Sequence, residues 1–436
     1  MAAARIKVLS VNEIAARLDD RFSLLTTGSR TAIPRHQTLR ATIDWSHDLL
    51  TESERILFRR LAVFAGGFTL EAAEAVCSQG EKRSDILDLL GRLVDKSLVI
   101  VDAALASGGT HYRLLETIRE YALMKLEEAE SATVIRDKHL EFFKKFAEET
   151  EPHLYAPEEV EWFARAEAEI DNMRAALDWS TIGMENESDA RIRNGLQLAG
   201  VLSWFWQKGY SYEFSERLRY LLSRENARAK TIERARALNA VGFLHWTMSN
   251  FTDARPYLEE ALEIGRMNED KLTLGWTLGY LGVVLSVLGE NDTAELLLKE
   301  CLAITKELGN IGNSLAGMGR SFLGDVYVVR HDEILAMEFY EEGAKLLRET
   351  HSLNMLAYVV RRLGYLVLKQ IDYERARSLF RESLIFNREV GHQIGMTAAV
   401  AGLAKLASSE GKLSHAAQLY GIVEARVAAV GLETVS

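Results

Sequence analysis

The segment FTDARPYLEEAL (251–262) belongs to a repeat that fills the second half of a 436-residue chain. Ala254, at its fourth position, recurs as Ala294, Ala336, Ala376 and Ala416, at intervals of 40, 42, 40 and 40 residues. The four later segments are NDTAELLLKECL (291–302), EILAMEFYEEGA (333–344), YERARSLFRESL (373–384) and LSHAAQLYGIVE (413–424). Repetition at this period is typical of stacked helix pairs, in which each pair buries an apolar face against the next.

Two further positions recur around each alanine. A small residue stands 12 positions before it, as Gly242, Gly282, Gly324, Gly364 and Ala404, and a large one 4 positions after it, as Leu258, Leu298, Tyr340, Phe380 and Tyr420. We expect the small residues to let paired helices approach closely and the large residues to fill the gap to the neighbouring pair. Together with a degenerate pair at 195–223, the pattern predicts about six helix pairs, stacked as a tetratricopeptide-like right-handed α-solenoid over residues 191–436.

Ahead of the repeats, the stretch PRHQTLRATIDWSHDLLTESERILFRRLAVFAGGFTLEAAEAVC (34–77) predicts three short helices. Thr51 and Glu54 have the spacing of a capping box, in which each side chain bonds the backbone of the other residue. Gly66 and Gly67 suit the end of the second helix, because glycine readily adopts left-handed backbone.

The helical period then gives way to strand signals. After a helix at about 84–96, SLVIVD (97–102) is apolar and β-branched, AALASGGT (103–110) is a turn, and HYRLL (111–115) returns. These segments predict one small β-hairpin. Helices followed by a hairpin predict a winged-helix domain over residues 34–130.

Two segments flank this domain. Residues 1–33 predict a short helical lead, with a capping box at Ser10 and Glu13, and residues 131–190 predict an acidic helical connector. Because the chain has only four prolines and is rich in helix-forming residues, we predict a mainly α class. The formal net charge of -11 argues against a general nucleic-acid carrier, which normally has a basic face.

The winged helix raises the question of DNA binding. We take the predicted helix at 70–77 as the reading helix; it carries Glu71 and Glu74 and no basic residue, and neither does the turn at 103–110. Since a DNA reader needs cations on these elements, we expect the domain to pack against neighbouring domains. A stand-alone DNA-binding transcription factor with a tetratricopeptide ligand domain remains the alternative.

Four strings within 34–130 carry a resemblance to a known family: RHQTLRATIDWSHDLL, RLAVFAGGFTLEAAEAVC, LLGRLVDKSLVIVD and YRLLETIREYALMKLEE. They resemble the middle of bacterial signal-transduction ATPases with numerous domains, including regulators of the NB-ARC, AfsR and MalT type. The resemblance implies a P-loop ATPase, a helical domain, a winged helix and a tetratricopeptide sensor, in that order. It implies that residues 1–33 are the end of the helical domain.

The chain departs from that family in two places. It lacks the Gly-x-x-x-x-Gly-Lys-Ser/Thr string that cradles nucleotide phosphates, so we expect the rear portion of such a protein, or one that lost its ATPase core. The resembling ATPases also carry a Met-His-Asp motif after the wing, whose histidine contacts bound ADP. Leu114, Leu115 and Glu116 occupy the matching positions, and leucine cannot donate a hydrogen bond to phosphate.

The concave face of the solenoid is the candidate site, because in resembling repeat proteins the first helix of each pair lines a groove. The repeat register places ten residues there: Asn239, Phe243, Trp246, Trp276, Asp325, Tyr358, Arg361, Tyr365, Lys369 and Lys405. Aromatic anchors beside charged groups are what a groove for a peptide, protein or small effector requires, although ordinary packing between helices would also explain several of them. We expect Trp246 and Trp276 to be solvent-facing anchors and Arg361 an orienting charge.

Other kinds of site have no support in the sequence. The ten histidines show no metal-ligand spacing and there is no nucleophile elbow, so we predict no metal, no cofactor and no enzyme. Cys77 and Cys301 are expected to be reduced core residues. The absence of a signal peptide and of a long apolar run predicts a cytoplasmic protein. The sequence thus predicts a non-catalytic sensor and interaction module of a regulator, whose solenoid binds a partner or effector and whose winged helix relays that state to an ATPase domain upstream or in trans.

Overall fold

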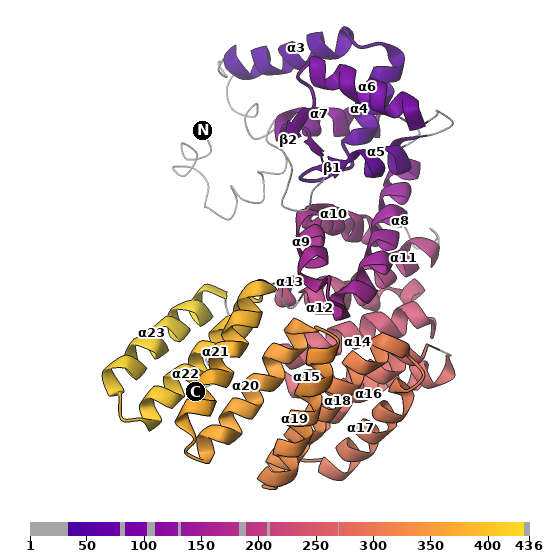
Figure 1. Ribbon diagram of the computed structural model, residues 1–436. Coiled ribbons are helices and arrows are strands. Elements are labelled where there is room, and N and C mark those ends of the chain that lie inside the picture. The colour runs from indigo at the N-terminus through magenta and orange to yellow at the C-terminus, as the bar shows by residue number, and fades with distance from the viewer. Residues whose placement is uncertain are drawn as a thin grey trace, which may run out of the picture. The chain divides into compact units, whose positions relative to one another are not determined.

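A computed structural model describes residues 34–78, 83–102, 110–129, 132–182, 189–206, 210–268 and 270–430 (Figure 1). The predicted lead at 1–33, with its capping box, lies outside these ranges, as does most of the predicted turn at 103–110. The chain divides into two compact units, with the boundary between Ile135 and Arg136.

The first unit holds six helices and three short strands among its described residues. They are α3 (Pro34–Asp48), α4 (Glu52–Leu61), β1 (Phe68–Thr69), α5 (Leu70–Cys77), α6 (Arg83–Asp95), β2 (Ile100–Asp102), β3 (His111–Arg113), α7 (Glu116–Glu127) and the start of α8 (Ala132–Thr150). The strands form an antiparallel sheet in the order β1-β3-β2, with β3 at its centre. This arrangement is the winged helix that the sequence predicted.

The strand β1 adds to the predicted hairpin. Phe68 pairs with Tyr112 and Thr69 with His111, so the sheet has three strands where one hairpin was expected. Two glycines before β1 let it approach β3. Gly66 has a positive φ of 83°, and Gly67 lies so close to β3 that a Cβ on it would be 2.6 Å from Nδ1 of His111. A two-residue strand is too short to show the alternation from which strands are predicted.

The capping box at the start of α4 is confirmed and has a second role. The Thr51 amide donates to Oε2 of Glu54 at 2.8 Å, and the Glu54 amide donates to Oγ1 of Thr51 at 3.4 Å. Nζ of Lys96 also donates to Oε2 of Glu54, at 2.6 Å, which ties the start of α4 to the residue after α6. The helix ends at Leu61, before the glycines at 66 and 67 where its end was predicted. Phe64 lies in the turn after the helix, and its side chain is buried.

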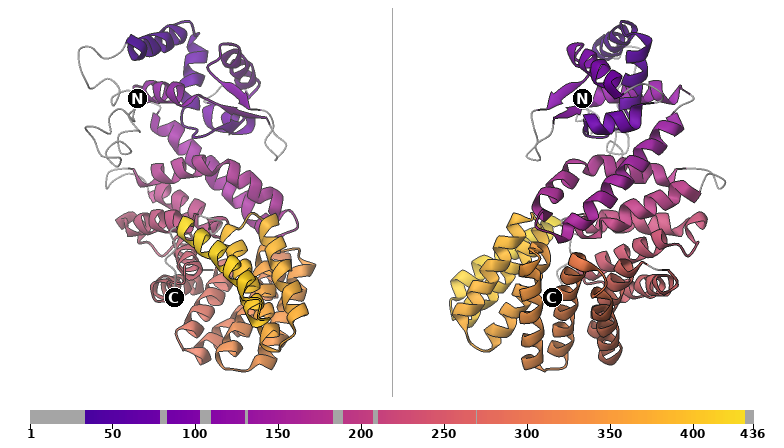
Figure 2. Two further views of the ribbon diagram at one scale, coloured as in Figure 1. Left: turned by 90° about the vertical axis from the view of Figure 1, so that its left-hand side faces the viewer. Right: turned by 45° about the vertical axis from the view of Figure 1, so that its right-hand side comes forward.

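The second unit begins within α8 and continues through short helices to five long helix pairs. The short helices are η3 (Glu151–Tyr155), α9 (Glu159–Ala168), α10 (Ile170–Thr181), α11 (Asp189–Val201), α12 (Ser203–Trp206), α13 (Ser211–Ser223) and η4 (Glu225–Ala227). The pairs are α14 (Ile232–Thr247) with α15 (Phe251–Met267), α16 (Lys271–Val287) with α17 (Asn291–Thr305), α18 (Gly309–Val329) with α19 (Glu333–Glu349), α20 (Leu353–Lys369) with α21 (Tyr373–Glu389), and α22 (Gln393–Ser409) with α23 (Leu413–Val430). Figure 2 shows these pairs, in pink through yellow, stacked next to one another.

The repeat positions explain how the helices of each pair meet. A Cβ on Gly242 would lie 2.4 Å from Cγ of Leu258, and one on Gly324 would lie 2.7 Å from Cε1 of Tyr340. The large residue therefore packs on the small residue of its own pair. Phe380 also meets Gly402 of the next pair, as expected for a residue that fills the gap between pairs.

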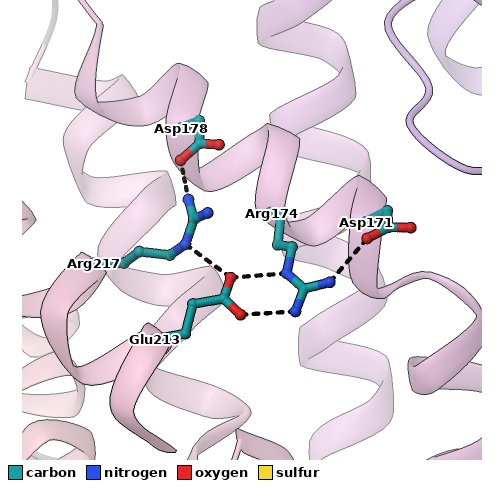
Figure 3. Close-up of polar contacts among 5 residues, drawn as sticks. All are labelled: Asp171, Arg174, Asp178, Glu213 and Arg217. Atoms are coloured by element: carbon teal, nitrogen blue, oxygen red, sulfur yellow. Dashed lines mark hydrogen bonds and ion pairs between the residues drawn. The ribbon is translucent and has the colours of Figure 1, made fainter. Parts of the chain in front are cut away.

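An ion-pair cluster fixes α10 of the connector to α13 (Figure 3). Arg174 donates twice to Glu213, from Nε at 2.8 Å and from Nη2 at 2.7 Å, and also bonds Asp171 at 2.9 Å. Arg217 lies between Glu213, at 3.1 Å, and Asp178. Such forked pairs constrain orientation, so the connector helices pack in one register against the start of the solenoid.

Two further properties concern the whole described chain. Both cysteines are buried and unbonded, as predicted, and burial followed by the charge of Glu300 raises the pKa of the Cys301 thiol to about 12. In the part of the chain that the structure describes, no helix combines the length and the apolarity that crossing a membrane requires.

Candidate functional site

A pocket of about 330 Å³ opens among the first helices of the pairs. It is built mainly from the carboxyl-terminal parts of α14, α16 and α18, the middle of α20 and the first turns of α22. Its lining is Trp246, Thr247, Ser249, Phe251, Val283, Ser286, Val287, Asp325, Val329, Tyr358, Arg361, Arg362, His392, Ile394, Gly395 and Ala398. Apolar walls with a few converging polar groups are typical of small-ligand sites.

Asp325 is the polar centre of the pocket, and it is already satisfied. Its side chain is buried and accepts hydrogen bonds from the hydroxyls of Tyr340 at 2.5 Å and Tyr358 at 2.6 Å. Nε of Arg362 donates to Oδ1 of Asp325 at 2.6 Å and completes an ion pair. Burial, reinforced by the charge of Asp325, holds the pKa of both tyrosines well above the usual range, so both hydroxyls remain donors.

Arg361 differs from its neighbour Arg362. Its guanidinium carbon lies 5.4 Å from the centroid of the Tyr358 ring, and the side chain is half-buried. Among the residues that the structure describes, no carboxylate lies within ion-pair distance of Arg361. Asp325 neutralises Arg362, so the charge of Arg361 makes the pocket net positive. The chain as a whole has a net charge of -11.

Four of the ten residues predicted from the repeat register meet in this pocket: Trp246, Asp325, Tyr358 and Arg361. The other six lie outside its lining. Tyr365 packs against Phe380 at 5.0 Å and has Nζ of Lys405 5.8 Å from its ring, and Lys369 pairs with Glu333 at 2.8 Å.

The remaining three are core residues, so the expectation that Trp276 is a solvent-facing anchor is wrong. Asn239 is buried and accepts a hydrogen bond from Oγ1 of Thr277 at 3.1 Å. Phe243 is fully buried, with its ring centroid 4.7 Å from that of Tyr280. Trp276 is only 4% exposed. The repeat register identifies the helix on which these residues lie, but not the depth of each side chain.

Trp276 is covered by the connector. The ring of Tyr155, in η3, stacks on the Trp276 ring at 5.4 Å, and Tyr280 stacks on Trp276 at 5.5 Å. We call residues 151–159, which comprise η3 and the loop to the first residue of α9, the strap. The sequence gives no sign of the strap, because its partners lie 85 to 197 residues away along the chain and no local period marks it.

The strap contacts the first helices of four successive pairs. Glu151 lies 3.5 Å from Nη1 of Arg236 in α14, and Tyr155 lies on Trp276 in α16. The carbonyl oxygen of Tyr155 accepts from the hydroxyls of Ser314 in α18 and Ser352 at the start of α20, each at 3.1 Å. The amide of Asn354 in α20 donates to Glu159 at 3.3 Å. The strap therefore joins the amino-terminal parts of α14, α16, α18 and α20. The pocket is built on the same four helices, nearer their carboxyl-terminal ends.

Glu151 is the strap residue with the strongest electrostatic consequence. Burial raises the pKa of its carboxyl group to about 7, although the charge of Arg236 acts against this, and nearby Asp270 and Glu148 reinforce it. Arg236 is shared, since its Nε and Nη2 also donate to Oδ2 of Asp270 at 2.9 and 2.7 Å. Arg236 is therefore the shared partner of two carboxyl groups, those of Glu151 and Asp270.

The winged helix requires a correction about its reading helix. The strand β1 shows that α4, α5 and α6 are the helices of the motif, and α6, the one directly before the β2–β3 hairpin, occupies the recognition position, not the predicted helix at 70–77. Among the described side chains of α6, the exposed charges are Asp85, Asp88 and Asp95 against Arg92 alone. The corrected helix is also acidic on its exposed face.

The positions that match the nucleotide-sensing motif lie at the start of α7. Leu115 precedes the helix and is 44% exposed. Glu116 pairs with Nη2 of Arg119 at 3.1 Å, and Arg119 donates to the carbonyl oxygen of Ala62 at 3.3 Å. Glu116 thus orients a residue that ties α7 to the end of α4.

Comparison with known proteins first defines the class of each part. Residues 50–127 match the winged helix-turn-helix domain family, and residues 233–307 match the tetratricopeptide repeat family. The chain is mainly α-helical, with a winged helix followed in the sequence by a tetratricopeptide-like solenoid.

Particular relatives then indicate the kind of protein. A Mycobacterium tuberculosis protein that carries the provisional name of an HTH-type transcriptional regulator is 36% identical over 361 residues, which cover 71% of this chain and 39% of that protein. The regulatory protein AfsR of Streptomyces griseus is 24% identical over 427 residues, or 91% of this chain and 41% of AfsR. The chain thus spans well under half the length of these relatives, and the likeness supports a regulatory role.

The solenoid also resembles solved structures. A Rap protein complexed with competence and sporulation factor superposes with a TM-score of 0.51 at 16% identity, covering 67% of this chain and 78% of that one. At this identity the likeness concerns the fold. The resemblance to signal-transduction ATPases stays a prediction.

Proposed function

We propose that this chain is the non-catalytic sensor part of a transcription regulator, in which the solenoid pocket binds an effector and the strap passes its occupancy to the winged helix. The observation that carries the proposal is the shared framework of pocket and strap. Both are built on α14, α16, α18 and α20, the pocket toward one end of these helices and the strap at the other.

The strap is suited to detect a change in helix spacing. The hydroxyls of Ser314 and Ser352 lie 2.8 Å apart and converge on one carbonyl oxygen of Tyr155. Solenoids change curvature by small rotations between neighbouring repeats. A ligand that draws α18 and α20 together or apart in the pocket would lengthen one of these bonds, because hydrogen bonds weaken steeply outside a narrow range of distance and angle.

The relay runs through the connector. The strap follows α8 directly in the sequence, and α8 starts in the winged-helix unit, since the unit boundary falls between Ile135 and Arg136. The Rap protein of similar fold was solved with a bound factor, which supports a ligand-binding role for the solenoid. The regulator relatives support transcription as the output.

We assign the winged helix to domain docking and relay instead of direct DNA reading. Phosphate contacts require cations, and the exposed face of α6 is acidic. The alternative, a stand-alone DNA-binding transcription factor, has the domain family in its favour and the charge of α6 against it.

The test uses the full chain and a small-molecule extract of the organism that encodes it. Fractions of the extract are screened for those that raise the thermal unfolding midpoint of the wild-type chain, with Ala398→Trp, which fills the pocket, as the matched control. We expect a fraction that stabilises the wild type and not the variant, because a ligand of the native state shifts its unfolding. The same fraction should change amide hydrogen exchange in residues 151–159. Equal stabilisation of both proteins would exclude the pocket, and unchanged exchange in the strap would exclude the relay.

A further inference from the structure

We infer that the pocket takes a small apolar molecule with a single negative charge, and that Arg361 binds its anionic group. This inference rests on the proposed function and names the chemical class of the effector. It starts from the contrast between two adjacent arginines: Arg362 is neutralised by Asp325, whereas Arg361 has no carboxylate partner among the described residues.

Arg361 is held in place although it forms no ion pair with any residue that the structure describes. Its guanidinium group lies over the ring of Tyr358 at 5.4 Å, and the Tyr358 hydroxyl is fixed by its 2.6 Å hydrogen bond to Asp325. A guanidinium on an aromatic face keeps its in-plane N–H groups available, and these match a carboxylate or sulfonate in a forked geometry. Asp325 and Tyr358 are therefore positioning residues for Arg361.

The charges of the pocket favour a ligand with one negative charge. A cationic ligand would meet Arg361, while the only carboxylate of the lining, Asp325, is already bonded to Arg362 and to two tyrosine hydroxyls. A phosphomonoester carries nearly two charges and would need His392 as a second cation beside Arg361, because Arg362 is engaged. One negative charge matches the single guanidinium that lacks a carboxylate partner.

The walls define the rest of the ligand. Val283, Val287, Val329, Ile394 and Ala398 supply an apolar surface, and Val287 and Val329 are 48% and 44% exposed. Exposed valines on two adjacent first helices gain free energy when an apolar body covers them. A pocket of about 330 Å³ is near the lower limit for ligand sites, so the occupant is a small molecule.

The experiment compares two fluorescent probes that share one ring system. 8-Anilino-1-naphthalenesulfonate carries a single negative charge, and N-phenyl-1-naphthylamine lacks the sulfonate. Each probe is titrated into the full-length wild-type chain, Arg361→Gln, Arg361→Lys and Arg193→Gln, which removes an exposed cation of α11 outside the pocket. Ala398→Trp defines the signal that comes from the pocket, and circular dichroism checks the fold of every variant.

We expect Arg361→Gln to weaken binding of the sulfonate at least tenfold and that of the neutral probe less than twofold, while Arg361→Lys is intermediate and Arg193→Gln resembles the wild type. If Arg361→Gln does not fold, the test rests on Arg361→Lys. If each probe then binds Arg361→Lys as tightly as it binds the wild type, the inference is overturned. If Ala398→Trp abolishes binding of both probes but Arg361→Gln changes neither, the pocket binds ligands and only the anion assignment is wrong. If Ala398→Trp changes neither probe, the pocket is no ligand site and the proposed function fails with the inference.

Discussion

The ring of Tyr155 covers the ring of Trp276, with the two centroids 5.4 Å apart and the planes inclined by 28°. The contact joins a short helix of the connector to the second helix pair of the solenoid. Because Tyr155 is also bonded through its carbonyl oxygen to the next two pairs, the connector is an integral part of the solenoid. Loss of this contact should therefore also affect the helix pairs that contain Ser314 and Ser352.

Replacing Tyr155 by alanine should lower the free energy of unfolding by about 3 kcal/mol, as for other buried aromatic side chains. Tyr155 is 5% exposed, whereas Tyr212 is 74% exposed and serves as the matched control. Chemical denaturation of both variants measures the difference. A loss for Tyr155→Ala no larger than that for Tyr212→Ala would mean that the strap is not held on the solenoid in solution.

Ser314 and Ser352 should act as a coupled pair. Each hydroxyl donates to the carbonyl oxygen of Tyr155, and the two oxygens lie 2.8 Å apart. We expect each single alanine variant to lose about 1 kcal/mol of stability, and the double variant to lose less than their sum, because both remove parts of one network. A double-mutant cycle by denaturation tests this, with exposed Ser409→Ala as the control. Strict additivity would contradict a shared network.

The contribution of Glu151 to the stability of the chain should fall as the pH rises from about 4.5 to above 7. The folded chain raises the pKa of Glu151 from 4.5 to about 7, so the protonated carboxyl group is favoured in the fold. Its contribution is fully present below the unfolded pKa and is lost as the pH passes the folded one, by at most about 3 kcal/mol. The groups that face Glu151 are Arg236, Asp270 and Glu148.

Glu151→Gln should remove this part of the pH dependence, because the amide does not titrate. Unfolding free energies of the wild type and the variant are compared between pH 4.5 and 8, with exposed Glu161→Gln as the control. The difference between wild type and Glu151→Gln should change across that window. A constant difference would show that the carboxyl group titrates normally.

The acidic face of α6 should prevent tight binding to DNA. The wild-type chain is expected to bind duplex DNA weakly and without sequence preference, and to lose that binding between 50 and 200 mM salt, since phosphate contacts release counterions. Replacing Asp85 and Asp88 by lysine should strengthen nonspecific binding, which fluorescence anisotropy can follow; the same change at exposed Asp253 and Asp292 of the solenoid is the control. Salt-resistant, sequence-dependent binding by the wild type would show that α6 or the wing reads DNA.

The sequence predicts the solenoid well because its repeat positions are determined by local packing. A glycine at position 242 or 324 is required by the large side chain that packs on it, and that requirement recurs at Gly282 and Gly364. The winged helix was predicted from its caps and turns for the same reason. Its reading helix was misassigned because β1 has only two residues and leaves no periodic signal.

The candidate site was predicted only in part. The repeat register identifies the helices that line the pocket, and it correctly places Trp246, Asp325, Tyr358 and Arg361 there. It does not reveal that the strap covers Trp276, since that contact depends on residues of the connector with no repeat of their own. Nor does it distinguish Arg361 from Arg362, because the partner of Arg362, Asp325, lies on another helix.

The central claim, that the pocket and the strap are coupled, is tested most directly by the effect of Tyr155→Ala on ligand affinity. Tyr155 does not line the pocket, so any effect must pass through the helices that they share. Coupling free energies act equally in both directions and commonly change affinity by about 5-fold or more. Affinities of the wild type, Tyr155→Ala and Tyr212→Ala for the sulfonate and neutral naphthyl probes are compared by fluorescence titration, with the signal of Ala398→Trp subtracted. We predict a change of at least about 5-fold for Tyr155→Ala and less than 2-fold for Tyr212→Ala; equal affinities of all three folded proteins would contradict the account.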